Sequence, residues 1–262
     1  MKIAAAQISL KLGDLEANTK KLLQKLEQAY NVGADIVVFP EMSDTGYDNK
    51  IMIDLAQNWE SGTIPELCKA AEKYKLNVVA GVSERVEDGV YNSMAIIDRN
   101  GKIIGKYRKT HLCTVEPFFE HKLFKAGDKL CQLELENINC GFINCYEIRF
   151  PEIVRTLSIQ GVKILFVPAA FPMVRLQHWK ILLEARAIEN QIFIVACNRV
   201  GLDNKNNFCG LTTIIDPYGT TTASGSAIHE KLIVGEIDME MINTVRSQIQ
   251  VHQDRRSDLY NL

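Results

Sequence analysis

The sequence has no excess of charge of either sign. Its 262 residues include 30 lysines and arginines and 32 aspartates and glutamates, which leaves a formal net charge of -2 at pH 7. A surface that binds nucleic acid or an anionic membrane usually carries a clustered basic excess. The composition therefore predicts neither a nucleic-acid partner nor a membrane partner, and it leaves small polar molecules as the expected class of ligand.

Long apolar runs are also missing. The N-terminal run MKIAAAQISL meets Lys11 before it reaches the length of a signal peptide. No later run approaches the length that a membrane-spanning helix needs. We therefore expect a cytoplasmic protein.

Cysteine pairs at short spacing are absent as well. The seven cysteines form an odd set without a CxxC motif, which is typical of reduced and mostly buried thiols. The five histidines are scattered, and neither His111 with Cys113 nor Cys140 with Cys145 has the spacing of a compact zinc site. We expect no metal and no organic cofactor.

Apolar side chains, by contrast, are abundant. Hydrophobic residues make up 47% of the chain and charged residues 24%, a balance that supports a large folded core. The Gly- and Asn-rich stretch 201–210 is too short for an interdomain linker, and we interpret it as a surface loop. The sequence therefore predicts one domain over residues 1–262.

Short β-type runs alternate with helical patterns along the chain. A helix is expected between Asp14, a potential N-cap, and Gly33, which would end it. The other helices are expected at 65–74, 151–160 and 176–190, and the strands at 3–10, 36–39, 77–82, 140–144, 164–167, 192–196 and 232–237. Turn sequences predict hairpins that join 91–97 to 102–107 and 211–215 to 220–222. This alternation indicates an α/β fold that mixes crossover units with antiparallel hairpins.

Three reactive side chains stand where predicted strands turn into loops: Glu41, Lys109 and Cys145. Each alone is an ordinary loop carboxylate, surface cation or buried thiol. Together they supply a proton acceptor, a cation for a developing oxyanion and a nucleophile. We expect Lys109 to favour the thiolate of Cys145, and partial burial to raise the pKa of Glu41 enough for it to accept the proton.

The segments around these residues resemble a known family. VVFPEMSDTGY, KYRKTHL and INCYEIRFPE are similar to the three signature segments of the nitrilase, or carbon-nitrogen hydrolase, superfamily, in the same order. The resemblance implies a catalytic triad of Glu41, Lys109 and Cys145, with Glu120 in FFEHKLFKAGD as a second glutamate beside it. It also implies a four-layer α-β-β-α sandwich that assembles as a homodimer or a higher homo-oligomer.

Two further segments resemble one branch of this superfamily. PAAFPMVRLQHWKILLEARAIENQIFIVACNRVG and the tail DRRSDLY look most like the ω-amidase type, which hydrolyses small carboxylate-bearing amides such as 2-oxoglutaramate. The branch that acts on deaminated glutathione shares much of this pattern. Hydrolysis of a nitrile or an N-carbamoyl group, and a catalytically silent binding protein on the same fold, also stay open.

The residues and the resemblance together suggest a mechanism. Cys145 attacks the amide carbonyl while Glu41 takes the thiol proton and delivers it to the leaving ammonia. Lys109 and a backbone N–H near Tyr146 stabilise the oxyanion. Water, which Glu41 activates and Glu120 helps to position, then opens the thioester.

The loop 171–177 is expected to recognise the substrate. Arg175 is the candidate for the substrate carboxylate, because a guanidinium binds a carboxylate with two parallel hydrogen bonds, and Phe171 is a second candidate for substrate binding. Many superfamily members have aspartate where this chain has Glu147. We expect the support network around Arg149 to survive that difference.

Overall fold

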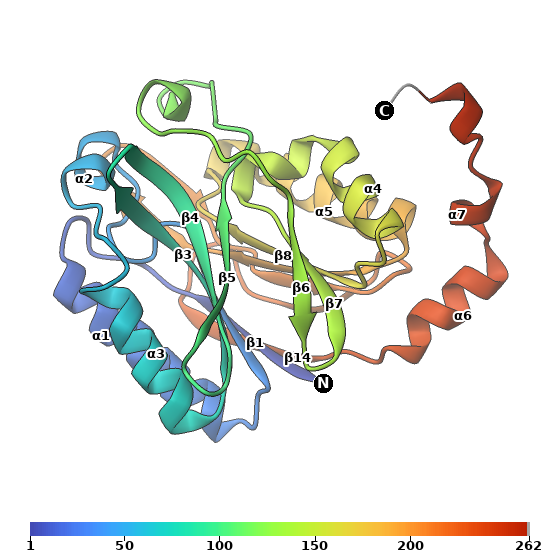
Figure 1. The fold of residues 1–262 in the computed structure, drawn as a ribbon, viewed down its shortest axis with the longest axis horizontal. Helices are drawn as coiled ribbons and strands as arrows, with labels where there is room; N and C mark the ends of the chain where they lie inside the picture. Colours follow the sequence, from blue (N-terminus) through green and yellow to red (C-terminus); the bar gives the residue numbers. More distant parts are fainter. Residues whose placement is uncertain (261–262) are drawn as a thin grey trace.

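Two six-stranded sheets form the centre of the structure, a computed structural model that describes residues 1–260 (Figure 1). The first sheet has the order β14-β1-β2-β3-β4-β5, in which β1, β2 and β3 are parallel and the remaining pairs are antiparallel. Its strands are β1 (Lys2–Gln7), β2 (Ile36–Phe39), β3 (Asn77–Val86), β4 (Gly89–Ile97), β5 (Ile103–Arg108) and β14 (Lys231–Glu236).

The second sheet repeats this arrangement. Its order is β13-β12-β9-β8-β7-β6, with β7, β8 and β9 parallel and antiparallel strands on both sides. Its strands are β6 (Cys131–Leu135), β7 (Ile138–Phe142), β8 (Ile164–Ala169), β9 (Phe193–Asn198), β12 (Thr213–Ile215) and β13 (Thr221–Ser224). A separate hairpin consists of β10 (Val200–Asp203) and β11 (Asn206–Cys209).

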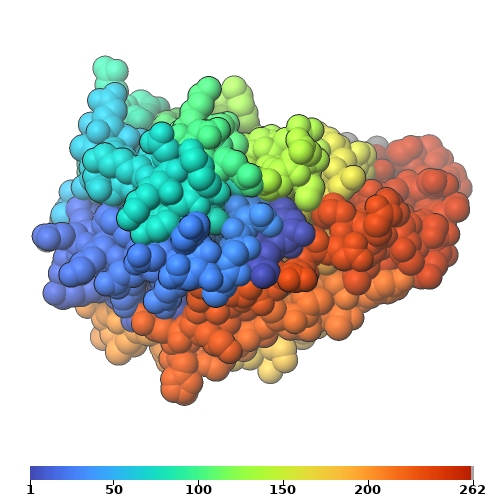
Figure 2. Space-filling view, turned by 90° about the horizontal axis from the view of Figure 1, so that it is seen from below, coloured from blue at the N-terminus to red at the C-terminus, as the bar shows by residue number. Residues whose placement is uncertain are grey.

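Helices cover the outer face of each sheet. Figure 1 shows α1 (Leu15–Asn31) and α3 (Thr63–Tyr74) on one side, and α4 (Pro151–Ile159) and α5 (Leu176–Asn190) on the other. Shorter elements are α2 (Asn49–Asp54), α6 (Glu240–Gln248), α7 (Val251–Asp254) and the 3-10 turns η1 (Glu120–Lys122), η2 (Cys145–Arg149), η3 (Met173–Arg175) and η4 (Ser257–Leu259). Figure 2 shows the C-terminal segment, in red, at the opposite end of the molecule from α1.

The alternation of side chains along the strands creates three apolar layers. In β1, Ile3 and Ala5 face the space between the sheets, whereas Ala4 and Ala6 pack under α1 and α3. In β8, Phe166 faces the same central space, while its neighbours pack under α4 and α5. Strands that are buried on both faces need continuous apolar runs. This is why the segments IVVF and ILFV predict strands so clearly.

The structure confirms the predicted four-layer α-β-β-α sandwich. The N-cap of α1 is also as expected, because the Asp14 carboxylate accepts a hydrogen bond from the backbone N–H of Ala17. No helix in the described part of the chain is long and apolar enough to cross a bilayer.

Several regions differ from the prediction, which includes neither α2 nor β6. Residues 201–210 largely form the β10–β11 hairpin instead of an irregular surface loop, because Phe208 and Cys209 are buried and Asp203 pairs with the buried Arg199 beneath them. The segment after residue 237, where no helix is predicted, contains α6, which packs Ile242 and Val245 inward.

We predict that Phe166→Ala lowers the free energy of unfolding by about 3–5 kcal/mol. Phe166 is fully buried between the sheets and stacks on Phe142 with a centroid distance of 5.6 Å, so the truncation leaves a cavity in the central layer. Urea unfolding measures the loss, with Ile228→Ala at a site that is 67% exposed as the control. A loss no larger than that of the control would contradict this view of the core.

Candidate active site

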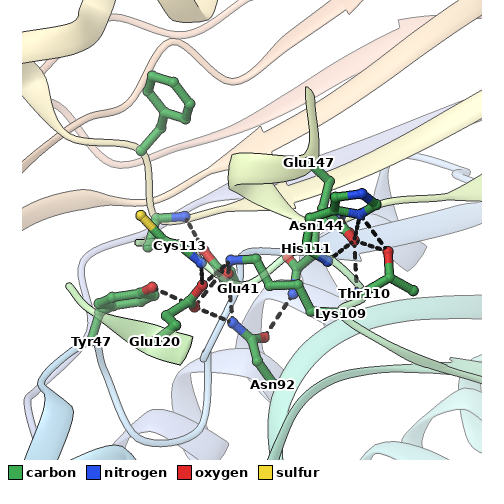
Figure 3. Close-up of polar contacts among 12 residues, drawn as sticks. Glu41, Tyr47, Asn92, Lys109, Thr110, His111, Cys113, Glu120, Asn144 and Glu147 are labelled. Atoms are coloured by element: carbon green, nitrogen blue, oxygen red, sulfur yellow. Dashed lines mark hydrogen bonds and ion pairs between the residues drawn. The ribbon is translucent and has the colours of Figure 1, made fainter. Parts of the chain in front are cut away.

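The structure brings together Glu41, Lys109, Glu120 and Cys145. Figure 3 shows Glu41, Lys109 and Glu120 in contact with one another. Glu41 follows β2 and Lys109 follows β5 in the first sheet, whereas Cys145 follows β7 in the second. Glu120 begins η1 in the loop between the two sheets. Both sheets therefore contribute to one cluster, as expected for residues at strand-to-loop junctions.

The turn that carries Glu41 is held against β3. Pro40 ends β2, and the backbone N–H of Ser43 donates to the carbonyl of Gly81 at 2.8 Å. A Cβ atom at Gly81 would stand 2.6 Å from the Cα of Glu41. Only glycine allows this close approach of two backbones, so Gly81 fixes the position of the Glu41 main chain.

Cys145 begins η2 with an unusual backbone conformation. Its φ angle is 47°, in the left-handed region that costs a non-glycine residue energy. Tyr146 is the next residue, in the first turn of η2, where backbone N–H groups have no acceptor within the helix. That turn therefore offers a hydrogen-bond donor beside the thiol, where the sequence predicts the oxyanion site.

Lys109 lies between the two glutamates. Its Nζ is 2.8 Å from Glu41 Oε1 and 2.8 Å from Glu120 Oε2, and all three side chains are buried. Burial works against the ammonium, but Glu120 and Glu41 raise the pKa of Lys109 well above its ordinary value. One cation cannot neutralise two carboxylates, so the two acids compete for it.

Hydrogen bonds distinguish the two carboxylates. Glu120 accepts from Lys109 and from three further donors, which are the Tyr47 hydroxyl at 2.6 Å, the Asn92 amide at 2.8 Å and the Cys113 N–H at 2.7 Å. Glu41 accepts from Lys109, the Asn92 amide at 2.7 Å and the Ala170 N–H at 3.0 Å.

The pKa values of the two acids are shifted in opposite directions. Although burial opposes it, Lys109 and the other donors hold the pKa of Glu120 below its ordinary value. Burial, together with the Glu120 charge, raises the pKa of Glu41 despite Lys109. Glu41 is therefore the better proton acceptor of the two.

Lys109 favours the thiolate of Cys145 as expected, but it is not the dominant influence on the thiol. Burial and the neighbouring Glu41 carboxylate raise the pKa of Cys145 well above its ordinary value, and the opposing effect of Lys109 is smaller. The expectation left out the burial and the two anions, which outweigh the cation. A thiolate can form here when its proton moves to Glu41.

Sequence reasoning missed Asn92, in β4. Its side-chain amide donates to Glu41 and Glu120, and its carbonyl oxygen accepts from the Asn144 amide at 2.7 Å. The available signal was a polar residue on a buried strand, YNSMAII, which has no reason to be polar unless it meets polar partners.

Glu147 connects the lysine loop to the turn that carries the thiol (Figure 3). Its buried carboxylate accepts from the Thr110 N–H at 2.8 Å, the His111 N–H at 3.0 Å and the Asn144 N–H at 2.7 Å, and also from the hydroxyl groups of Tyr107 and Thr110. Although burial opposes it, hydrogen bonds hold its pKa below the ordinary value. We expected Glu147 to belong to a network around Arg149. Among residues 1–260, however, Glu147 forms no ion pair with Arg149.

A cavity of about 280 Å³ opens beside the cluster. Lys109 and Cys145 are buried residues of its lining, and the rings of Tyr47, Phe118 and Phe171 form part of its wall. Arg175 and Phe171 line it as the sequence predicts, and Cys113, treated as an ordinary buried thiol, lines it too.

The solvent side of the cavity is cationic. Arg149, which sequence reasoning did not select for binding, lines it together with Arg175 and His178. Arg149 lies 3.3 Å from the Nδ1 atom of His178. Within the described chain, neither arginine forms an ion pair with a carboxylate, and no group of three His, Cys, Asp or Glu side chains is arranged to hold a metal ion.

Comparison with known proteins agrees with this geometry. A family model described as carbon-nitrogen hydrolase matches residues 2–247. The chain is 39% identical to a 2-oxoglutaramate amidase of Bacillus subtilis, with 98% of each chain covered, and 28% identical to a chloroplastic omega-amidase of Arabidopsis thaliana, with 99% of this chain and 73% of the relative covered. A solved Saccharomyces cerevisiae protein, a member of branch 10 of the nitrilase superfamily, is similar with a TM-score of 0.90 and 27% identity over 98% of this chain and 96% of that chain.

We predict that Glu147→Gln lowers the free energy of unfolding by about 3 kcal/mol and lowers kcat, because an amide NH2 then faces buried donors and the two loops lose their link. Glu147→Asp, which keeps the charge, should lose less on both measures. Denaturant unfolding and steady-state rates check this, with the exposed Glu152→Gln on α4 as the control. Equal effects of the Gln and Asp variants would contradict a role for the charge.

Proposed function

The chain belongs to the carbon-nitrogen hydrolase family, whose members hydrolyse carbon-nitrogen bonds other than peptide bonds, and we propose that it is an amidase for a small linear amide with a carboxylate at its other end, such as 2-oxoglutaramate. The observation that carries this proposal is a buried Glu41–Lys109–Glu120 cluster beside Cys145, next to a cavity that is also lined by two arginines without carboxylate partners. The products are the acid and ammonia.

The first half-reaction forms a thioester. The Cys145 sulfur attacks the amide carbon as its proton moves to Glu41, and the carbonyl oxygen becomes an oxyanion. Lys109 and the backbone N–H of Tyr146 stabilise this charge. Glu41 then delivers the proton to the nitrogen, the carbon-nitrogen bond breaks, and ammonia leaves.

The second half-reaction releases the acid. Glu41, again ionised, takes a proton from water, and the resulting hydroxide attacks the thioester carbon. The carbon-sulfur bond breaks, and the proton returns from Glu41 to Cys145. Glu120 keeps Lys109 in place throughout, since its four donors hold it as an anion.

The cavity supports a small carboxylate-bearing substrate over the alternatives. Pockets for drug-sized ligands measure roughly 300–1,000 Å³, so about 280 Å³ suits a short chain better than deaminated glutathione. Arg149 and Arg175 can hold the substrate carboxylate and place its amide at Cys145. A simple nitrile or an uncharged amide makes no use of these cations.

The setting of the enzyme is part of the proposal. We place it in the cytoplasm as a homodimer or a higher homo-oligomer. The helix layer of the second sheet supports pairing, because α5 exposes Ile181 and Ile188 at 60% and 52%, and the end of α4 exposes Ile159 at 48%. Exposed apolar side chains on one face are typical of an interface between copies.

We predict ammonia release from 2-oxoglutaramate and succinamate in preference to deaminated glutathione, N-carbamoyl amino acids and nitriles. Cys145→Ala should abolish turnover, whereas Cys140→Ala, at another buried thiol in β7, should keep it. Mass spectrometry of the protein quenched during turnover should find the acyl group on Cys145. An acyl group on another cysteine, or full activity of Cys145→Ala, would overturn the mechanism.

The two arginines give a separate prediction. Arg149→Met and Arg175→Met should each raise KM for 2-oxoglutaramate roughly tenfold or more, since each removes a charged hydrogen bond to the carboxylate. KM for a neutral amide such as propionamide should stay unchanged in both variants. Arg99→Met, on the distant hairpin between β4 and β5, is the control and should keep the parental KM for both amides. Equal effects on charged and neutral amides would show that the carboxylate binds elsewhere.

A further inference from the structure

Asn92 lies at the edge of the acidic cluster and points its amide toward both glutamates (Figure 3). Its Nδ2 is 2.7 Å from Glu41 Oε1 and 2.8 Å from Glu120 Oε1, and the residue is fully buried in β4. A primary amide has two N–H groups. One therefore serves each carboxylate, so both donors are used within the cluster.

The rest of Asn92 is equally engaged. Its Oδ1 accepts from Asn144 Nδ2 at 2.7 Å, and Asn144 directly precedes Cys145. Its backbone carbonyl accepts from the Lys109 N–H at 2.9 Å. The bond from Asn144 also fixes which way the Asn92 amide points, because reversing it would turn a carbonyl oxygen toward two carboxylates.

We propose that Asn92 is a positioning residue: its amide divides two hydrogen bonds between Glu41 and Glu120, keeps Glu41 ionised and, through Asn144, fixes both carboxylates relative to Cys145. This inference rests on the proposed function, since it assigns Asn92 a role in the proton transfer to Glu41. It acts through Glu41 and does not need to touch the substrate.

The electrostatic effect has a definite sign. A donor to an ionised carboxylate stabilises the charged form, so removing the Asn92 amide makes Glu41 easier to protonate. Several other titratable groups face Glu41, and all remain in an Asn92 variant: Lys109, Glu120, Cys145, Tyr47 and Cys113. The change expected on substitution is therefore the loss of one donor from an otherwise intact cluster.

We predict that Asn92→Ala moves the acid limb of the kcat/KM profile upward by about one pH unit. Glu41 must be ionised to accept the thiol proton, so activity is lost as pH falls through its pKa, and a raised pKa brings that loss to higher pH. Asn92→Asp should move the limb further, because it keeps the shape but adds a third anion. A purely structural role would lower the rate equally at all pH values.

Alkylation of Cys145 by iodoacetamide tests the same idea without turnover. If the loss of the Asn92 amide raises the pKa of Glu41 by one unit, Glu41 takes the proton of Cys145 more readily, and the thiolate fraction at neutral pH rises about tenfold. The alkylation rate of Asn92→Ala should rise by the same factor. Peptide mass spectrometry reports this rate at Cys145 alone. Asn92→Asp should react faster still, although it opens no cavity that would admit the reagent.

Asn190→Ala is the matched control. Asn190 is also a fully buried asparagine, but its amide donates to the Arg186 carbonyl within α5, away from the cluster. It should lose stability without changing the acid limb or the alkylation rate. If the enzyme is active and Asn92→Ala keeps the parental acid limb and alkylation rate, the role of Asn92 is overturned while the proposed function stands. If the parental protein hydrolyses no amide, the proposed function fails, and the alkylation rates still decide the role of Asn92.

Discussion

The site depends on one buried positive charge. Burying an ion costs several kcal/mol after relaxation, and Lys109 is offset by two carboxylates within 2.8 Å. With the thiol neutral, the ionised cluster carries a net charge of -1, and burial keeps solvent from screening it. The fold must therefore supply neutral donors, and it does so through one hydroxyl, one side-chain amide and two backbone N–H groups.

Those donors come from both sheets, which makes the sandwich itself part of the chemistry. Glu41 receives the Asn92 amide from β4 of the first sheet and the Ala170 N–H from the end of β8 in the second. Cys145 stands on the second sheet and Lys109 on the first. The central apolar layer, in which Phe142 and Phe166 of the second sheet join residues such as Ile3 of the first, fixes the distance between the sheets, so it also fixes the distance between Cys145 and Glu41. Close-packed interiors allow little adjustment of such a distance.

The sequence was informative where the type of a residue alone decides the structure that it forms. Apolar runs such as IVVF predict buried strands, and the junctions after them predict Glu41 and Cys145. The sequence was uninformative where the position of a side chain depends on the residue that contacts it in the folded protein. Arg199 and Asp203 are typical surface residues until the fold pairs them in the interior. Arg149 and Arg175 are indistinguishable in type, and the structure shows that both line the cavity. The protonation of Cys145 likewise depends on burial and on Glu41, which no local pattern contains.

The charge balance of the cluster also bears on how a substrate enters. The buried end of the cavity has a net negative charge, and the solvent side has Arg149 and Arg175 without carboxylate partners. The acidic buried end repels an anionic substrate, and the two arginines attract it. Its carboxylate therefore stays at the solvent side of the cavity, and its neutral amide enters the buried end. In the proposed reaction, the imbalance that raises the pKa of Glu41 therefore also orients the substrate. One buried lysine shared by two acids is enough to produce both effects.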